Sequence, residues 1–452
     1  MESSFHSRGD ASQGRIIKEY VSQLPLHTKA DIPSERRFVI ASPASQGFAR
    51  AEDVSASRRW IAFIFLMSAE FFYGWSWNTV DLLRPQIRDS LSLTLTQAGS
   101  AYTAQSLGAL TGAVILGQAA DRFGRRRTLF FVIAGYGISG GLGALVGSYL
   151  QLLGQRFLLG FFLGAIFPVL IASYMSLFPS GMRGKLAALG QGTYNMSVVA
   201  LGWAYGTRIG QNDWHILLWA GAIPPVLLAP MVFIFLPDDR NMQAWGAQGR
   251  PPPPAKLPIL ELFKSELVRR TLLLFLLVGL NFFAYQAFAG WVTTYLKDVK
   301  LFAPAVISRI VYWQFIGAVF GGFFWGWFSD RFGRRISAIG FFLGGASVLL
   351  YLTVLHSPAQ LQYGGALWGF MITASVAWAP WMSELFPAHL RSTAMSIFNW
   401  GRLISMTSPL ITGAVADAYG LTSAMLLSAL AFMLGGVVWL LIPETINRQR
   451  FG

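Results

Sequence analysis

From Trp60 to the end of the chain, apolar stretches of about 20 residues alternate with short polar turns. An α-helix needs about 20 predominantly apolar residues to cross a hydrocarbon core about 30 Å thick. The pattern therefore predicts an all-α membrane protein with twelve transmembrane helices. The predicted spans are about 60–83, 98–119, 128–147, 151–174, 186–206, 214–236, 271–295, 305–328, 336–355, 361–382, 392–416 and 422–442.

The longest interruption of this pattern is the polar segment 237–270, which includes four consecutive prolines from Pro251 to Pro254. It divides the predicted helices into six and six. We therefore expect a six-helix bundle at 58–236, a cytoplasmic linker at 237–270 and a second six-helix bundle at 271–445. Residues 1–57 are polar and contain no apolar run long enough for a signal peptide, so they are expected to form a disordered cytoplasmic tail. Residues 446–452 form a short C-terminal tail.

The charge distribution supports this topology. Only 12% of the residues are charged, against about 25% in a typical soluble domain. Apart from the tail and from Arg156 and Arg402 inside the spans, twenty basic residues fall on one side of the predicted membrane and six on the other. Because Lys and Arg collect on the cytoplasmic side, both termini are predicted in the cytoplasm and the chain in a bacterial-type inner membrane. The net charge of +14 then reflects orientation in the lipid bilayer and does not indicate nucleic acid as a partner.

Several kinds of chemistry have no support in the sequence. The chain contains no cysteine, which excludes disulfides, thiolate metal sites and thiol nucleophiles. It has neither a G-x-x-x-x-G-K-[ST] phosphate loop nor an H-E-x-x-H metal motif. We therefore expect neither an enzyme nor a bound metal or cofactor.

Two stretches of sequence match across the central break. GAVILGQAADRFGRRRTL at 112–129 corresponds to GGFFWGWFSDRFGRRISA at 321–338, at an offset of 209, and LFPSGMR at 177–183 corresponds to LFPAHLR at 385–391, at an offset of 208. Two independent matches at nearly one spacing indicate that the two halves are parallel structural repeats.

The doubled motif G-x-x-x-D-R-x-G-R-R resembles that of major facilitator superfamily transporters, and the resemblance covers about 60–445. It implies the major facilitator fold, with the motif residues as a cytoplasmic gate. In this interpretation the glycines let two helices approach, and the acid and arginines form a charge latch. The alternative is that the arginines only anchor the topology. The motif residues are Gly117, Asp121, Arg122, Gly124, Arg125, Arg126, Gly326, Asp330, Arg331, Gly333, Arg334 and Arg335.

Further segments resemble those of subgroups that carry organic acids and sugars. Arg156, in RFLLGFFLG, is similar to the helix-four motif of proton-coupled members, although an interhelical anchor would explain it too. GRLISMTSP at 401–409 resembles helix eleven of aromatic-acid symporters, whereas PET at 443–445 is similar to the helix end of sugar and organic-acid porters. The D-G-x-D pattern of the aromatic-acid symporters is absent, because the corresponding stretch reads Tyr-Gly-Trp-Ser at 73–76. This departure leaves the proton-coupling group open.

Two ionisable residues lie near the middle of predicted spans. Glu70 is about ten residues into the first span and Arg402 about eleven into the eleventh. Such positions are costly in a membrane and usually mark function. We predict that Glu70 couples transport to protons and that Arg402 binds a substrate carboxylate through two parallel hydrogen bonds. A structural ion pair between these two residues is the alternative.

Aromatic and amide side chains at helical spacing are further candidates for substrate contact, and interhelical packing is their alternative role. In the superfamily resembled, helices one, four, seven and ten line the cavity. The candidates are Trp75, Gln191, Tyr194, Asn281, Tyr285, Trp378 and Asn399.

Taken together, these features predict a secondary transporter that takes up a small organic anion with protons by alternating access and works as a monomer. An aromatic or other carboxylate is the expected substrate. A neutral sugar or polyol is the alternative, and a non-transporting membrane sensor or scaffold is a rival from another class.

Overall fold

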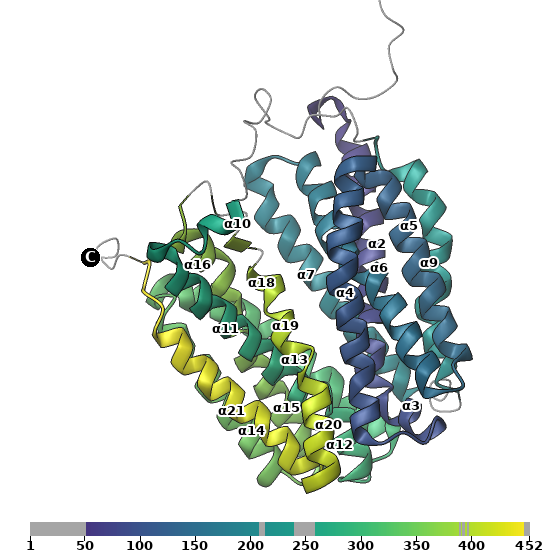
Figure 1. Cartoon of the computed structure of the whole chain (residues 1–452), viewed down its shortest axis with the longest axis vertical. Helices are drawn as coiled ribbons and strands as arrows, with labels where there is room; N and C mark the ends of the chain where they lie inside the picture. Colours follow the sequence, from purple (N-terminus) through teal and green to yellow (C-terminus); the bar gives the residue numbers. More distant parts are fainter. Residues whose placement is uncertain are drawn as a thin grey trace, which may run out of the picture. The chain divides into compact units, whose positions relative to one another are not determined.

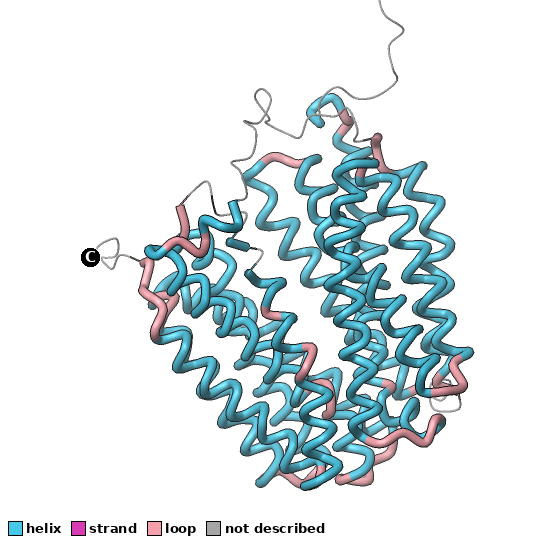
Figure 2. Tube along the Cα trace, viewed as in Figure 1, coloured by secondary structure: helices cyan, strands magenta, loops and turns pink. Residues whose placement is uncertain are grey.

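The computed structural model describes residues 51–207, 213–238, 258–387, 390, 394–395 and 397–446, and every regular element in these ranges is a helix (Figure 2). The first half contains η1 (Ala51–Asp53), α2 (Ala56–Leu82), α3 (Arg84–Ser90), α4 (Leu95–Phe123), α5 (Arg125–Leu142), η2 (Gly143–Leu145), α6 (Tyr149–Leu177), α7 (Ser180–Gly206) and α9 (His215–Phe235). The second half contains α10 (Pro258–Glu261), α11 (Ser265–Phe288), α12 (Val292–Asp298), α13 (Pro304–Phe332), η3 (Ile336–Ala338), α14 (Ile339–Thr353), α15 (Pro358–Ile372), η4 (Thr373–Ala377), α16 (Trp378–Leu385), α18 (Ile397–Trp400), α19 (Arg402–Ser405), α20 (Ser408–Tyr419) and α21 (Leu421–Leu440).

Most of the predicted tail, 1–50, lies outside the described residues, as do most of the linker, 239–257, and the last residues, 447–452. The part of the tail that is described, 51–57, is not extended. It forms the turn η1 and the first residues of α2, and Ala51 and Val54 are buried.

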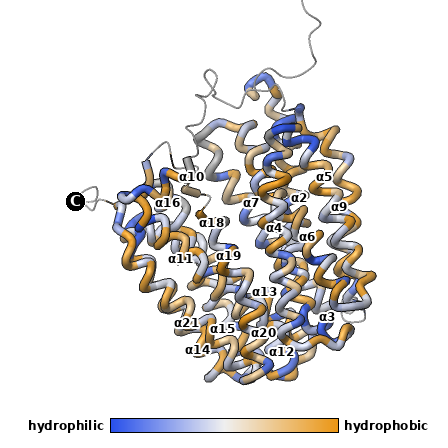
Figure 3. Tube along the Cα trace, viewed as in Figure 1, coloured by the Kyte–Doolittle hydropathy of each residue, from blue (hydrophilic) through white to orange (hydrophobic). Residues whose placement is uncertain are grey.

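Each predicted span coincides with a helix or with a short series of helices. Within the described chain, seven segments are long and apolar enough to cross a membrane: Arg125–Leu145, Tyr149–Leu177, His215–Phe235, Ser265–Asp298, Pro304–Phe332, Ile336–Thr353 and Leu421–Leu440. Three other spans correspond to α2, α4 and α7, which are 27, 29 and 27 residues long but more polar. The two remaining spans, 361–382 and 392–416, correspond to the interrupted series α15–η4–α16 and α18–α20. Figure 3 shows hydrophobic residues along the peripheral helices α5, α9, α14 and α21, and hydrophilic ones gathered near the helix ends.

Two glycines end equivalent helices in the two halves. Gly124 follows α4 with a φ of 91°, and Gly333, 209 positions later, follows α13 with a φ of 122°. Residues that carry a Cβ atom are strained at such φ angles, so glycine is favoured at both positions. Helix termination therefore explains these two glycines of the repeated motif.

Close packing of helix pairs is repeated in the same way. A Cβ atom added to Gly112 of α4 would lie 1.7 Å from the carbonyl oxygen of Phe161 of α6, and one added to Gly321 of α13 would lie 2.3 Å from that of Phe370 of α15. A second pair with the same offset of 209, Gly160 and Gly369, approaches backbone equally closely. Small residues let membrane helices pack backbone to backbone. The two halves thus share one internal packing scheme, as the sequence repeat predicts.

The two halves meet along one end of the molecule, which carries α3 and α12 and is called the outer end below. Here α4 packs against α20, α7 against α13, and α3 lies beside α12. The Ser308 hydroxyl donates to the Gly202 carbonyl over 2.6 Å, and the Thr103 hydroxyl donates to the Met406 carbonyl over 2.7 Å. Toward the opposite end, where α10 and α16 lie, the two groups of helices diverge (Figure 1).

Candidate functional site

Glu70 lies in the interior of the first half, on α2. Its side chain is 1% exposed, and neither carboxylate oxygen has a hydrogen-bond partner among the described residues. Its ionisable neighbours include Tyr136 of α5 and Tyr174 of α6. The alternative of an ion pair with Arg402 is not realised, because no salt bridge to Glu70 is found in the described chain.

Arg402 lies at the boundary between the two halves. It opens α19, directly after Gly401, and is half-buried. Its guanidinium carbon lies 4.7 Å from the ring centroid of Trp77 on α2 and 6.0 Å from that of Phe282 on α11. The Tyr73 phenol is within hydrogen-bonding reach. No carboxylate of the described residues pairs with this guanidinium, so its planar fork is available to an anion.

The first half presents a wall of aromatic rings beside Arg402. Tyr73 lies 5.8 Å from Tyr194 and 6.1 Å from Trp77, and Trp77 lies 6.3 Å from Tyr102, all between ring centroids. The Asn78 amide donates to the Tyr194 hydroxyl over 3.0 Å. The wall therefore combines flat apolar faces with hydroxyl groups, which suits a planar ligand that carries polar substituents.

Other predicted contact residues are distributed around this wall. Tyr285 of α11 lies within electrostatic reach of Tyr194 and Tyr102, two members of the aromatic wall. Its ring centroid lies 5.8 Å from that of Trp368. Asn281, one helical turn before Tyr285, is buried. Gln191 is exposed on α7 and donates to the Asn195 side chain over 3.4 Å. Asn399 lies in α18, but its side chain is outside the described residues.

Two predicted contact residues are not brought to this site. The Trp75 indole donates to the carbonyl of Leu217 on α9 over 2.9 Å, so this ring packs inside the first half. Trp378 is 1% exposed and packs between Phe341 and Trp439, at 5.4 and 5.2 Å. In this conformation both rings pack between helices. Trp75 and Trp77 lie on opposite faces of α2. The sequence alone could not show which of these faces turns toward Arg402.

The structure also reveals a charged cluster around Asp81, a residue that the sequence pattern did not single out. Asp81, near the end of α2, forms an ion pair with Arg84 over 2.7 Å, and both side chains are buried. Arg156 of α6 is 1% exposed and donates to the Thr79 hydroxyl over 3.3 Å. Asp81 lies within the predicted span 60–83, so a count of all acids inside the spans would have found it. Within the described ranges no group of three or more His, Asp or Glu residues is placed to hold a metal ion.

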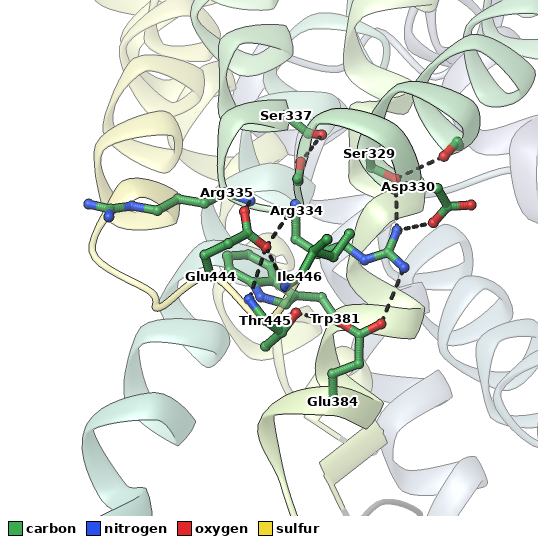
Figure 4. Close-up of polar contacts among 12 residues, drawn as sticks. Ser329, Asp330, Arg334, Arg335, Ser337, Trp381, Glu384, Glu444, Thr445 and Ile446 are labelled. Atoms are coloured by element: carbon green, nitrogen blue, oxygen red, sulfur yellow. Dashed lines mark hydrogen bonds and ion pairs between the residues drawn. The ribbon is translucent and has the colours of Figure 1, made fainter. Parts of the chain in front are cut away.

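The repeated motif forms a charge cluster in the second half (Figure 4). Arg334 is buried and forms ion pairs with Asp330, four residues earlier, and with Glu384 of α16 over 3.2 Å. Glu444, of the PET segment, accepts hydrogen bonds from the backbone N–H groups of Arg334 and Arg335 over 3.1 and 2.8 Å. Arg335 and Arg331 are themselves exposed. The cluster joins three segments of the second half.

In the first half the motif is arranged differently. Arg125 donates to the Ala172 carbonyl of α6 over 2.9 Å, and Arg126 to the Phe233 carbonyl of α9. Arg122 is exposed, and the side chain of Asp121 lies outside the described residues.

The expected close approach at Gly117 and Gly326 is not made in this conformation. No atom lies within 4 Å of the Cβ that either glycine would carry. The helix ends that bear the motif lie at the divergent end of the molecule, where the neighbouring half is distant (Figure 1). The close helix contacts fall instead at other glycines of the same stretches, Gly112 and Gly321.

Comparison with known proteins places this geometry in a family. The model of the Major Facilitator Superfamily matches residues 66–308 and 301–450. The gallate transporter of Pseudomonas putida is 26% identical over 393 residues, which span 80% of this chain and 86% of the relative. The cis,cis-muconate transport protein of Acinetobacter baylyi is 26% identical over 398 residues, which span 84% of this chain and 94% of the relative.

A solved structure supports the fold. The bacterial homologue of the human lysosomal transporter Spinster, in an inward-facing and unoccupied conformation, superimposes with a TM-score of 0.74 at 14% identity. The superposition covers 86% of this chain and 98% of the homologue. At this identity the likeness concerns the fold alone, and it agrees with two repeated bundles of helices.

Proposed function

Because this chain belongs to the Major Facilitator Superfamily, and is therefore a multi-pass membrane transporter and not an enzyme, we propose that it takes up a small organic anion together with protons. The mechanism is alternating access, in which the two halves rock about a central site. In this proposal the protein lies in the inner membrane with both termini in the cytoplasm, and the site opens to the cytoplasm while the outer ends of the two halves meet. The protein works as a monomer.

The observation that carries this proposal is the guanidinium of Arg402. It lies between the two halves, contacts the ring of Trp77 at 4.7 Å and has no carboxylate partner in the described chain. An arginine in a membrane interior without an acid is costly, and a substrate carboxylate removes that cost. A guanidinium binds a carboxylate through two parallel hydrogen bonds, which gives orientation as well as affinity.

The neighbouring rings define the rest of the ligand. Tyr73, Trp77 and Tyr102 offer faces for stacking, and the hydrogen-bonded pair Asn78–Tyr194 offers a polar contact beyond them. Tyr285 and Asn281 supply polar groups from the second half. An aromatic carboxylate with a ring hydroxyl fits this arrangement. Gallate is such a compound, whereas muconate, the cargo of the other relative, has carboxylates but no ring. The carboxylate is thus the feature common to both.

Protons are carried by Glu70 in this proposal. Its buried carboxyl group has no hydrogen-bond partner in the part of the chain that the structure describes, and a bound proton removes the cost of burying an unpaired charge. Asp81 is the second candidate, because it is the other buried acid of α2 and lies between Arg84 and Arg156. The gating motifs around Asp121 and Asp330 hold the cytoplasmic ends together in the opposite conformation.

Transport by purified protein in liposomes tests the proposal. We expect a proton gradient directed into the liposomes, with the outside more acidic, to drive accumulation of labelled gallate or muconate above the level in protein-free liposomes. Xylose, a neutral sugar, tests the alternative suggested by the PET segment. Accumulation of xylose but of neither acid would mean that the substrate is a sugar and not an organic anion. Failure to move any of the three compounds, in protein shown to be folded, would favour the sensor or scaffold.

A further inference from the structure

The outer end of α2 holds a buried cluster with more positive than negative groups. Asp81, Arg84 and Arg156 are 8%, 1% and 1% exposed, and Asp81 is the acid that pairs with Arg84. Arg156 is held by the neutral hydroxyl of Thr79. Two guanidinium groups therefore share one carboxylate in a place that water does not reach freely.

The donors of this cluster are not all used. Nε and Nη1 of Arg84, and Nε of Arg156, have no hydrogen-bond partner among the described residues. Burying such donors without an acceptor costs free energy, more so on a charged group. The cluster thus lacks an acceptor, and its chemistry fits a carboxylate, which offers two oxygens and the missing negative charge.

The cover over Arg84 comes from the other half of the molecule. The ring of Trp291, which immediately precedes α12, lies 4.3 Å from the guanidinium carbon. Gln286 of α11 is within reach of the Asp81 carboxylate, and the Thr293 hydroxyl donates to the Asp81 carbonyl over 2.9 Å. When the outer ends of the two halves separate, these groups leave with the second half. The same movement uncovers the unused donors of Arg84.

The cluster lies on the same wall as the Arg402 site. Asp81 follows Trp77 by four residues, so the two share a face of α2 and are about 6 Å apart along the helix axis. Trp77 contacts Arg402. Tyr102 lies within electrostatic reach of both Arg84 and Arg402. An anion released by Arg84 therefore has a short path along aromatic rings to Arg402.

We propose that Arg84 is a second carboxylate-binding residue, which receives the organic anion when the outer ends of the two halves are apart and passes it to Arg402. The inference rests on the proposed function, since it requires an anionic substrate. Asp81 has a complementary part. It keeps one nitrogen of Arg84 paired after the substrate has moved inward, which lowers the cost of covering this arginine with Trp291. Closure of the outer end is thereby favoured once the anion has left.

Substrate exchange measured separately from the two faces tests this inference. Protein in right-side-out and in inside-out vesicles exchanges labelled gallate, or muconate if wild type prefers it, without a pH gradient, so that proton coupling is not required. We expect Arg84→Gln to raise the KM at the outer face about tenfold, as the loss of a hydrogen bond to a charged group does. The KM at the inner face, where Arg402 is reached directly, should change less than twofold.

Arg84→Gln leaves Asp81 without its partner and so endangers folding. The double variant Arg84→Gln/Asp81→Asn removes both charges and should show the same one-sided rise in KM. Arg309→Gln, which removes an exposed arginine of α13, is the matched control and should leave both KM values unchanged.

An unchanged outer KM in a folded double variant, with Arg402→Ala still raising KM at both faces, would overturn the inference and leave the proposed function intact. Buried water would then account for the unused donors. If wild-type protein exchanges no organic anion, the proposed function fails first, and the inference falls with it.

Discussion

The guanidinium of Arg402 lies 4.7 Å from the ring centroid of Trp77, so the arginine of one half rests on an aromatic ring of the other. Both residues lie where the two halves meet, and a movement of one half against the other changes their contact. In the proposed mechanism, that movement changes the contacts of a ligand held between them.

Replacement of Arg402 tests the carboxylate site. Arg402→Ala should raise the KM for the transported acid about 10- to 100-fold, because a hydrogen bond to a charged group contributes about 1.5–3 kcal/mol. Arg402→Lys keeps the charge but not the planar fork and should fall between wild type and Ala. Uptake kinetics with Arg309→Ala as control provide the measurement. Unchanged KM in Arg402→Ala would remove this residue from the site.

The aromatic wall should distinguish ring-containing from open-chain acids. Trp77→Leu removes a stacking face and the cation–π contact with Arg402, whereas Trp77→Phe keeps a smaller ring. We expect Trp77→Leu to weaken gallate transport several-fold more than muconate transport, and Trp77→Phe to have the smaller effect. Competition between the two acids for uptake measures the ratio. An equal loss for both would mean that Trp77 supports Arg402 without touching the substrate ring.

Glu70 and Asp81 can be separated by their effect on coupling. Glu70→Gln should abolish accumulation driven by a pH gradient while substrate exchange without a gradient continues, because the amide cannot carry the proton. The double variant Arg84→Gln/Asp81→Asn, which leaves neither charge unpaired, should retain gradient-driven accumulation if Glu70 is the carrier. The opposite pattern would transfer the role to Asp81. Glu266→Gln, which removes an exposed acid of α11, serves as the control for loss of an acid.

Glycines of the repeated stretch should differ sharply in their tolerance of alanine. A Cβ at Gly112 would lie 1.7 Å from the Phe161 carbonyl oxygen, whereas Gly117, five residues later, has no neighbour within 4 Å. We expect Gly112→Ala to destabilise the protein by about 1–3 kcal/mol, as overpacking does, and Gly117→Ala to leave the melting temperature unchanged. Thermal unfolding in detergent measures both. Slower transport in the stable Gly117→Ala protein would indicate that this glycine is needed when the cytoplasmic ends close.

An ion network at the outer end should hold that end closed over a wide pH range. Arg88 pairs with Asp298 of α12 and with Asp89, and Lys297 pairs with Asp89 across the two halves. Burial would raise the pKa of Asp89, but hydrogen bonds from Lys297 and Arg88 outweigh it and keep the pKa below the usual 3.8. The contribution of Asp89 is therefore fully present above that usual value and is lost only as the pH falls through the lowered pKa.

Two consequences can be measured on a cysteine introduced beneath this network, since the natural chain has none. Labelling from the outer face should stay slow between pH 5 and 8. It should become faster in Asp89→Asn/Asp298→Asn, in which the pairs between the halves are lost. Labelling of the introduced cysteine that accelerates below pH 7 while Asp89 and Asp298 are both present would show that groups other than these carboxylates control closure.

Much of the architecture was predictable because it depends on local pattern. Apolar runs of membrane-spanning length predicted the helices, and the offset of 209 predicted that Gly124 and Gly333 would occupy equivalent places. The mid-membrane positions of Glu70 and Arg402 singled them out as polar residues that hydrocarbon does not tolerate without a reason. Glu70 and Arg402 are still candidates for their proposed roles, which transport measurements must test.

What the sequence by itself determined is the set of helices, their division into two repeats and the short list of charged residues inside them, because helix length, hydropathy and residue spacing are properties of a single segment. Only the tertiary structure decided which face of each helix looks inward. It turned Trp77 toward Arg402 and Trp75 toward α9, and it placed Asp81 and Arg84 beneath Trp291. These relationships join residues far apart in the chain, and they depend on how two halves pack and move, which no spacing along one segment specifies.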